Sequence, residues 1–244
     1  MASKNKKGSP VKNLNLPASK LPMLGHKSDD FRNSFHWRVL RIMSEFVDGF
    51  TFLADFNDIK TVTMFGSAKF GENSRWYTVA RNLGKLLAKK GYGVVTGGGP
   101  GIMEAGNRGA SEAGGESIGL NIQLPQEQRV NPWVKKGVGF HYFFSRKVML
   151  IYSAQAYVYF PGGFGTLDEF FELVTLRQTK KISDKIPIIC MGHEFWDPLA
   201  KWINSTVYEK FDGIDKADMK IYTIVDTPEE AWAIIKKSPH VKYF

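Results

Sequence analysis

The amino-acid sequence predicts an α/β protein with a parallel sheet and helices on both faces. Along the chain, short apolar segments typical of buried strands alternate with segments of helical periodicity. Three of the predicted strands run directly into turns of glycine and other small residues that precede a helix. The 244 residues suffice for one sizeable core, and α/β domains of this length commonly form a single unit.

The N-terminal part differs from the rest of the chain in charge. Residues 1–41 hold nine Lys or Arg against Asp29 and Asp30, so they carry most of the formal net charge of +9. Residues 1–28 are rich in Lys, Ser, Asn and Pro, and we expect them to form a disordered basic leader. We favour a solvated tail over a nucleic-acid-binding arm, because the remainder of the chain is nearly neutral.

Residues 29–58 are predicted to form an extra N-terminal helix, with Asp30 as a suitable N-cap and an end near Phe56. This face is too aromatic for a free-standing helix, so we expect it to pack on the domain or on a second subunit. The apolar side chains at helical spacing are Phe35, Val39, Ile42, Phe46, Phe50 and Leu53.

The main domain is predicted to span residues 59–244. Its first strand, residues 61–65, leads to a helix over residues 74–90 that Gly91 and Gly93 end. A strand at 94–96, a helix at 102–113 and a strand at 117–122 follow. Residues 124–139 contain two prolines and few periodic positions, so they predict a long loop of the kind that is often functional.

The second half of the domain repeats the alternation. A helix over residues 143–152 precedes a buried strand at 156–160, and the next helix is predicted to start at the N-cap Thr166 and to end near Gln178. The remaining predicted elements are a strand at 186–191, a helix at 194–210, a strand at 221–225 and a helix opened by Thr227.

Composition argues against several classes of protein. The single cysteine, Cys190, lies in an apolar segment, so neither a disulfide nor a thiolate-rich metal site can form. The five histidines lack metal-ligand spacing, and we expect no metal. The longest apolar run, residues 148–160, is interrupted by Ser153 and Gln155 and is too short to cross a bilayer. We expect a cytoplasmic protein that binds neither membrane nor nucleic acid.

Three loops suit a phosphate group: Gly66-Ser67, residues 97–101 and residues 162–166. A parallel topology would bring them to one edge of the sheet, where the first N–H groups of the following helices lack partners. Residues 97–101 are not a P-loop, because no Gly-Lys-Ser/Thr follows them. They also lack the Gly-x-Gly-x-x-Gly pattern with a later acidic residue, which makes a dinucleotide dehydrogenase a weak alternative.

Arg146 and Glu169 place a cation and a carboxylate near these loops. Together with a phosphate site they suit cleavage of a nucleotide's glycosidic bond. The carboxylate can stabilise oxocarbenium character or activate water, and the arginine can hold the phosphate or assist the departing base. Each residue also has a purely structural alternative, since Thr166-x-x-Glu169 fits a capping box and Arg146 fits the surface of a helix.

Exposed aromatic residues predict an assembly. The cluster of Phe140, Tyr142, Phe143 and Phe144, added to the N-terminal helix, exceeds the apolar surface that one domain of this size should leave exposed. We therefore expect a homodimer or a higher homo-oligomer.

Two linked motifs carry a resemblance to a known family. Residues 161–169 read Pro-Gly-Gly-Phe-Gly-Thr-Leu-Asp-Glu, and Arg146-Lys147 lies one helix upstream. These match the Pro-Gly-Gly-x-Gly-Thr-x-x-Glu signature and the Arg-Lys pair of the LONELY GUY (LOG) family, and the glycine loop with Ile102-Met103 also matches. The similarity extends from about Trp37 to Ile235 and fits the longer bacterial branch of the family. Glu104 departs from the plant members, which have glycine there.

The resemblance implies a Rossmann-like fold and a cytokinin riboside 5′-monophosphate phosphoribohydrolase, or a more general nucleoside 5′-monophosphate nucleosidase. It also implies a homodimer with its sites near the interface. By the same resemblance Arg146 and Glu169 are catalytic, residues 162–166 bind phosphate, and Glu127, Lys147 and Thr175 help to bind the substrate. With the other glycine loops included, the expected substrate-binding residues are Gly66, Ser67, Gly97, Gly98, Gly99, Gly101, Met103, Glu127, Lys147, Gly162, Gly163, Phe164, Gly165, Thr166 and Thr175.

Two other functions are alternatives to this one. Members of the family often carry the label lysine decarboxylase, but that reaction needs pyridoxal phosphate on a Schiff-base lysine, and no lysine here has such a context. We therefore expect no cofactor. The rival from another class is a nucleotide-binding or carrier protein without turnover, because phosphate loops on this fold serve binding as readily as chemistry.

Overall fold

The computed structural model describes residues 35–123 and 130–240 of the chain. The chain divides into two compact units, residues 1–41 and residues 42–244. Of the first unit the structure describes residues 35–41, which lie in helix α1 (Phe35–Ala54). The predicted leader, residues 1–28, and the predicted N-cap Asp30 lie outside the described residues.

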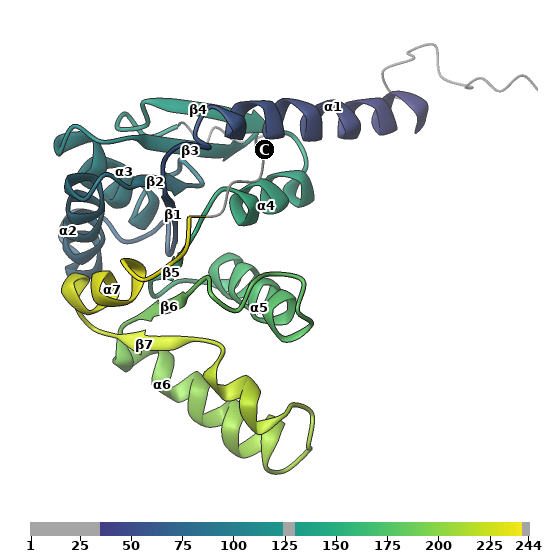
Figure 1. Ribbon diagram of the computed structural model, residues 1–244, viewed down its shortest axis with the longest axis vertical. Coiled ribbons are helices and arrows are strands. Elements are labelled where there is room, and N and C mark those ends of the chain that lie inside the picture. Colours follow the sequence, from purple (N-terminus) through teal and green to yellow (C-terminus); the bar gives the residue numbers. More distant parts are fainter. Residues whose placement is uncertain (1–34, 124–129, 241–244) are drawn as a thin grey trace, which may run out of the picture. The chain divides into compact units, whose positions relative to one another are not determined.

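Seven parallel strands form one sheet within the described residues, in the order β4-β3-β2-β1-β5-β6-β7 (Figure 1). The chain builds outward from β1 to β4 on one side, returns to β5, and builds outward to β7 on the other. The strand order therefore reverses between β1 and β5, and ligands of open α/β sheets bind at the carboxyl ends of the strands at such a point. The strands are β1 (Thr61–Phe65), β2 (Gly93–Thr96), β3 (Ser117–Ile122), β4 (Lys136–Phe140), β5 (Tyr157–Tyr159), β6 (Ile188–Met191) and β7 (Thr223–Val225).

Helices cover both faces of this sheet. On one face α2 (Arg75–Lys89), α3 (Ile102–Glu112) and α7 (Pro228–Ile235) share a hydrophobic core with the central strands. Side chains of α4 (Phe143–Tyr152), α5 (Phe164–Gln178), α6 (His193–Trp202) and the end of α1 form a second core on the other face. The predicted doubly wound, Rossmann-like α/β fold is thus confirmed.

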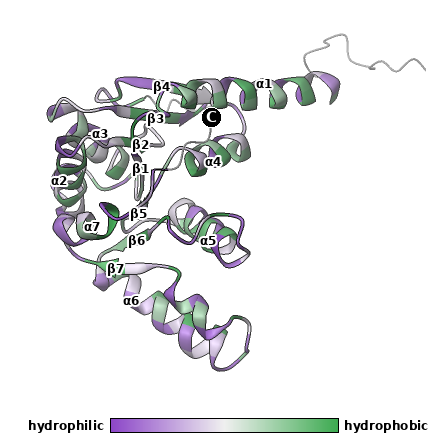
Figure 2. Cartoon of the chain, in the orientation of Figure 1, coloured by the Kyte–Doolittle hydropathy of each residue, from purple (hydrophilic) through white to green (hydrophobic). Residues whose placement is uncertain are grey.

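Hydropathy explains why the elements sort in this way. The residues of β1, β2, β3, β5 and β6 are all buried, as expected for strands covered on both faces. Figure 2 shows hydrophobic and hydrophilic residues together on α4, α5 and α6, which is typical of helices that bury one face. No helix in the described part of the chain is long and apolar enough to span a bilayer.

Two predicted elements were wrong. The long loop predicted for residues 124–139 contains most of β4, which pairs in parallel with β3 through Gly119 and Gly137. This edge strand escaped prediction because two glycines interrupt it and most of it is not buried. The helix predicted over residues 194–210 is α6 only to Trp202 and then continues as a π-helix, Ile203–Tyr208, followed later by a 3-10 helix, Lys216–Lys220.

Candidate active site

A cavity of about 380 Å³ lies at the carboxyl ends of β1, β2 and β5. The loops after these strands line it together with residues of α3, α4 and α5, so it occupies the point where the strand order reverses. The lining residues that the sequence singled out are Gly66, Ser67, Gly97, Met103, Arg146, Gly163, Gly165, Thr166 and Glu169.

The main chain of Ser67 joins the three glycine loops. Its N–H donates to the Pro161 carbonyl oxygen at 3.1 Å, and its carbonyl oxygen accepts from the N–H of Ile102 at 3.0 Å. Gly101 has a φ of +71°, and a Cβ there would collide with the Ser67 carbonyl oxygen. Gly162 is equally restricted, because a Cβ would collide with the Thr166 hydroxyl. Hydrogen bonds of the Ser67 main chain therefore connect the three loops.

Asparagine side chains fix the carbonyl groups of the loop after β2. Asn121 Nδ2 donates to the Gly97 carbonyl oxygen at 3.3 Å. Asn131 donates from its main-chain N–H to the Gly98 carbonyl oxygen at 2.8 Å and from Nδ2 to that of Gly99 at 3.0 Å. Three consecutive peptide groups are thus tied to β3 and to the segment before β4, which leaves this loop little freedom.

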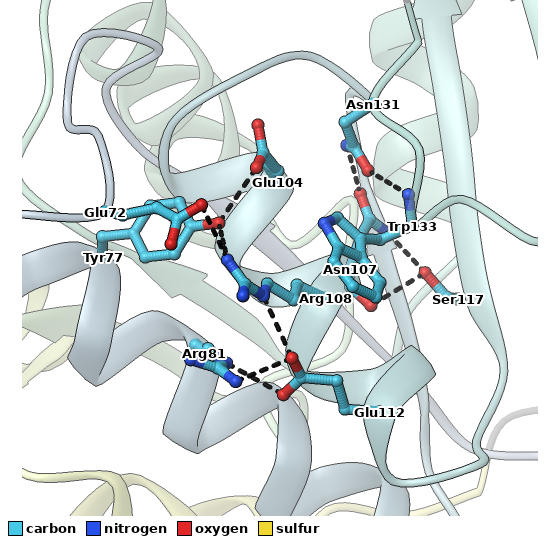
Figure 3. A network of polar contacts seen from close by, with 10 residues as sticks. All are labelled: Glu72, Tyr77, Arg81, Glu104, Asn107, Arg108, Glu112, Ser117, Asn131 and Trp133. Carbon is cyan, nitrogen blue, oxygen red and sulfur yellow. Dashed lines mark hydrogen bonds and ion pairs between the residues drawn. The ribbon is translucent and has the colours of Figure 1, made fainter.

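Asn107 completes the support of this loop (Figure 3). Its side chain is fully buried, and its Oδ1 accepts from the Thr96 hydroxyl at 2.6 Å and from Asn131 Nδ2 at 3.0 Å. Its Nδ2 donates to Ser117 Oγ at 3.0 Å. Because each buried polar group in this network has a partner, the network is rigid and costly to disturb. Sequence reasoning missed Asn107 and Asn131. The signal available was an asparagine in the middle of a predicted helix.

An ionic cluster ties α3 to its surroundings on the outer side of the same network (Figure 3). Arg108 pairs with Glu72 at 2.8 Å and with Glu112 at 3.0 Å, and its guanidinium lies 5.0 Å from the Trp133 ring centroid. The hydroxyl of Tyr77 on α2 donates to Glu104 Oε1 at 3.0 Å. Glu104, where the sequence departs from the plant pattern, therefore belongs to this cluster.

Arg146 and Glu169 face each other inside the cavity. Arg146 Nη2 lies 3.5 Å from Glu169 Oε1, and their side chains are only 12% and 17% exposed. Burial raises the pKa of Glu169 to about 7, against the opposing effects of Arg146 and Lys147. Burial also lowers the pKa of Arg146, and its Nε is buried without a hydrogen-bond partner among the described residues. Burial therefore disfavours the charged form of both groups, and Arg146 Nε has unused hydrogen-bonding capacity.

The structural alternatives for these two residues are wrong. Helix α5 begins at Phe164 with Gly163 as its N-cap, so Thr166 is a buried residue of the first turn and not the N-cap. Glu169 makes no capping box and points to Arg146 instead. Arg146 is not a surface residue of its helix but a nearly buried one. The N-cap prediction failed because glycine also serves as an N-cap, and Gly163 takes that position three residues before Thr166.

Lys147 links the same two helices outside the cavity. Its Nζ lies 2.9 Å from Asp168 Oδ2 and 2.8 Å from Glu172 Oε2. Burial lowers the pKa of Lys147, but the hydrogen bonds to the two carboxylates outweigh this effect and raise it above its ordinary value. Lys147 is thus a firmly charged neighbour of the Arg146–Glu169 pair.

The other described residues that were expected in the site do not line this cavity. Thr175 lines a separate cavity of about 230 Å³ between α5 and the segments that follow α6, and its hydroxyl donates to the Phe171 carbonyl oxygen at 2.7 Å. Phe164 is 92% exposed. Glu127 lies outside the described residues. The glycines that belong to the three loops without lining the cavity are Gly98, Gly99, Gly101 and Gly162.

Known proteins resemble this chain over most of its length. The chain is 29% identical over 181 residues to the cytokinin riboside 5′-monophosphate phosphoribohydrolase LOG of Oryza sativa subsp. japonica. The aligned residues cover 72% of this chain and 71% of that protein. It is 27% identical over 158 residues to the cytokinin riboside 5′-monophosphate phosphoribohydrolase of Rhodococcoides fascians, over 62% of this chain and 78% of that protein.

Solved structures share the fold. The X-ray structure of TM1055 has a TM-score of 0.52 at 28% identity and covers 73% of this chain and 99% of that chain. The Moco carrier protein of Chlamydomonas reinhardtii has a TM-score of 0.53 at 24% identity over 73% of this chain and 96% of that one, a likeness in fold alone. The family model described as "Possible lysine decarboxylase", to which LOG proteins conform, matches residues 103–235, more than half of the sequence. The chain therefore belongs to the LOG family.

Proposed function

We propose that this LOG-family hydrolase cleaves the N-glycosidic bond of nucleoside 5′-monophosphates and releases the free base and ribose 5-phosphate. The observation that carries the proposal is the buried Arg146–Glu169 pair in a cavity framed by glycine loops. The substrates we propose are adenine-type or cytokinin ribotides, in keeping with the names of the Oryza and Rhodococcoides relatives.

The phosphate group would bind at the glycine loops. Helices α3 and α5 both begin at a glycine N-cap, Gly101 and Gly163, and neither has a side-chain cap. The Ile102 N–H of α3 already donates to the Ser67 carbonyl oxygen, so an anion would bind to the remaining N–H groups of the two first turns and to the positive ends of the helix dipoles. Met103 and Gly165, in the first turns of these helices, both line the cavity. This arrangement supports a substrate that carries a terminal phosphate.

Glu169 would act on the ribose and on water. In its ionised form the carboxylate can accept a proton from a water molecule, whose oxygen forms the new bond to C1′ of the ribose. The C1′–N bond breaks, its electron pair leaves with the base, and the base takes up a proton. With a pKa of about 7, Glu169 is present in both protonation states near neutral pH. Arg146 would hold the phosphate or stabilise charge on the departing base.

The test is to separate products by chromatography after incubation with a panel of nucleoside 5′-monophosphates and the matching nucleosides. We expect free base from the monophosphates and very little from the nucleosides, because the glycine loops would contribute binding only when a phosphate is present. Equal cleavage of adenosine and its monophosphate would contradict the proposed role of the loops. A non-catalytic nucleotide carrier, the alternative on the same fold, would bind monophosphates without releasing any base.

We further propose that the protein works as a homodimer in the cytoplasm. Exposed apolar side chains support the assembly, among them Met43 and Val47 on α1 and Phe143 and Phe144 on α4. Phe140, predicted to be exposed with the other aromatic residues, is instead buried at the end of β4 and belongs to the core. The substrate contacts expected of Lys147, Thr175 and Glu127 remain proposals.

A further inference from the structure

Helix α4 receives its N-terminal cap from a distant helix. Its N-cap residue, Tyr142, makes no side-chain capping bond. Instead, the carboxylate of Glu45 on α1 accepts hydrogen bonds from the main-chain N–H of His141 at 2.6 Å and of Tyr142 at 3.2 Å. It also accepts from Ser145 Oγ at 2.5 Å. A negative charge at this place also suits the helix dipole.

Close packing holds α4 against the same stretch of α1. A Cβ at Gly49 would lie 2.8 Å from Met149 Sδ, so the backbone of α1 passes close to the Met149 side chain of α4. The ring of Phe50 meets that of Tyr152 edge to face, with centroids 5.3 Å apart. Glu45 thus fixes the start of α4 while the glycine contact and the aromatic pair fix its end.

The first turn of α4 carries Arg146. Its main-chain N–H donates to the Tyr142 carbonyl oxygen at 3.3 Å, one turn after the residues that Glu45 holds. Within residues 35–123 and 130–240 the guanidinium forms a 3.5 Å ion pair with Glu169 and lies 5.3 Å from the ring centroid of Phe143 in the same helical turn, while its Nε has no hydrogen-bond partner. The position of Arg146 therefore depends on where the first turn of α4 lies.

We propose that Glu45 is a positioning residue, which caps α4 from α1 and thereby sets Arg146 opposite Glu169. The link to turnover rests on the proposed function, whereas the effect on the geometry of the pair does not. The hydrogen-bond partners of Glu45 in the described part of the chain are His141, Tyr142 and Ser145, and none of them lines the cavity. Glu45 therefore acts through Arg146 and not on the substrate.

The substitution Glu45→Gln tests this role. Glutamine keeps the size of the side chain but turns an NH₂ group toward N–H donors and removes the charge. We expect kcat/KM for a nucleoside monophosphate to fall about 10- to 100-fold, the range expected when a reacting group is misplaced. The matched control is Asp48→Asn, which removes an exposed carboxylate one turn further along α1 and should change kcat/KM less than about 2-fold.

A double-mutant cycle separates positioning from general stability. In an Arg146→Ala background, Glu45→Gln should cost less than about 2-fold in kcat/KM, because the group it positions is already absent. The same loss in both backgrounds would overturn the proposal, and so would unchanged activity of Glu45→Gln alone. If Glu45→Gln does not fold, Ser145→Ala removes one of the three donors and serves in the same cycle.

A second measurement does not depend on turnover. The carboxyl carbon of Glu169 can be titrated by ¹³C NMR, with its signal assigned by its loss in Glu169→Gln. Besides Arg146, the charged groups Lys147 on α4 and Asp168 and Glu172 on α5 act on this carboxyl. Lys147 follows Arg146 in the chain and also lowers the pKa of Glu169, so its displacement would act in the same direction. Misplacing Arg146 should raise the midpoint by about half a pH unit or more in Glu45→Gln and leave it unchanged in Asp48→Asn. An unshifted midpoint refutes the positioning role, whereas a shifted one in a protein that cleaves no nucleotide refutes only the proposed function.

Discussion

Arg146 and Glu169 lie 3.5 Å apart in a nearly buried pair, at a distance longer than a charge-assisted hydrogen bond. Neither side chain therefore satisfies the other. Burial shifts the pKa of each toward its neutral form, so the protein keeps two charges close together at an energetic cost. A polar group that contacts both side chains would supply hydrogen bonds that they do not give each other, and this supports the proposal that the pair binds a substrate.

Replacing Glu169 with glutamine should separate an enzyme from a carrier. Glu169→Gln removes the negative charge and keeps the size of the side chain, so the protein should fold and bind nucleoside monophosphate. Turnover should fall about 10²- to 10⁴-fold, as is common for a group that acts in proton transfer. Product chromatography and calorimetric titration check the two parts, with Glu194→Gln, an exposed carboxylate of α6, as the control. Turnover like that of the unmodified protein would favour the carrier.

Stability should depend on pH through Glu169. Its pKa of about 7 in the folded protein exceeds the ordinary value of 4.5, so the folded state binds the proton more tightly than the unfolded state. This contribution to stability is complete below about pH 4.5 and is lost as the pH rises to about 7. Glu169→Gln should therefore be more stable than the parent protein above pH 7, by up to about 3 kcal/mol. Denaturant unfolding at pH 5 and pH 8 measures the difference, and an equal effect at both values contradicts it.

Arg146→Ala should weaken binding as well as turnover. The guanidinium is the buried cation of the cavity, and a charge-assisted bond to phosphate contributes about 1.5–3 kcal/mol, so the dissociation constant of a nucleoside monophosphate should rise by about 10-fold or more. Arg146→Lys should restore binding only in part, because lysine cannot make a bidentate contact. Calorimetry with the matching nucleoside, whose affinity should change little, tells phosphate binding from base binding.

The buried network around Asn107 predicts a large loss of stability without a change of charge. Asn107→Ala removes one buried side-chain partner from each of Thr96, Ser117 and Asn131, and unfolding free energy should fall by about 2–4 kcal/mol. Arg81→Ala removes a partly exposed ion pair with Glu112 and should cost less than about 1 kcal/mol. Thermal unfolding of the two variants compares them directly, and equal losses would show that the network is not the stronger support.

Assembly can be tested on the exposed face of α4. Light scattering at micromolar concentration should give at least the mass of a dimer, and Phe144→Glu should shift the protein toward a monomer if this face is buried between subunits. Phe211→Glu changes another exposed aromatic residue, 67% exposed against 49% for Phe144, and serves as the control. A monomeric parent protein would refute the homodimer.

The sequence predicted the sheet and its glycine loops well because both depend on local signals. Buried strands such as β5 and β6 are continuous apolar runs, and the turns after them contain glycine. The edge strand β4 lacks such a run, and so it was predicted as part of a loop. The π-helix after α6 was also missed, because one extra residue per turn does not alter a short apolar pattern.

The site was predictable only in part. Arg146 and Glu169 stand out by their motifs, and the structure brings them together. Glu45 could not be found in this way, because it lies about 100 residues from the helix it caps and no local pattern connects the two. The raised pKa of Glu169 also required the fold, since its main cause is burial by surrounding elements.

The role of Ser67 has a consequence for how such a protein can diversify. Its bonds to the neighbouring loops use only main-chain atoms, which every amino acid except proline retains. Substitutions of its side chain can therefore alter the chemistry of the cavity wall while the loop framework persists. A lineage built on this frame could change the cavity wall at this position in single mutational steps, without first passing through unstable intermediates. Proline at position 67 would remove the N–H that donates to the Pro161 carbonyl oxygen, so it is the one substitution that would break this connection between the loops.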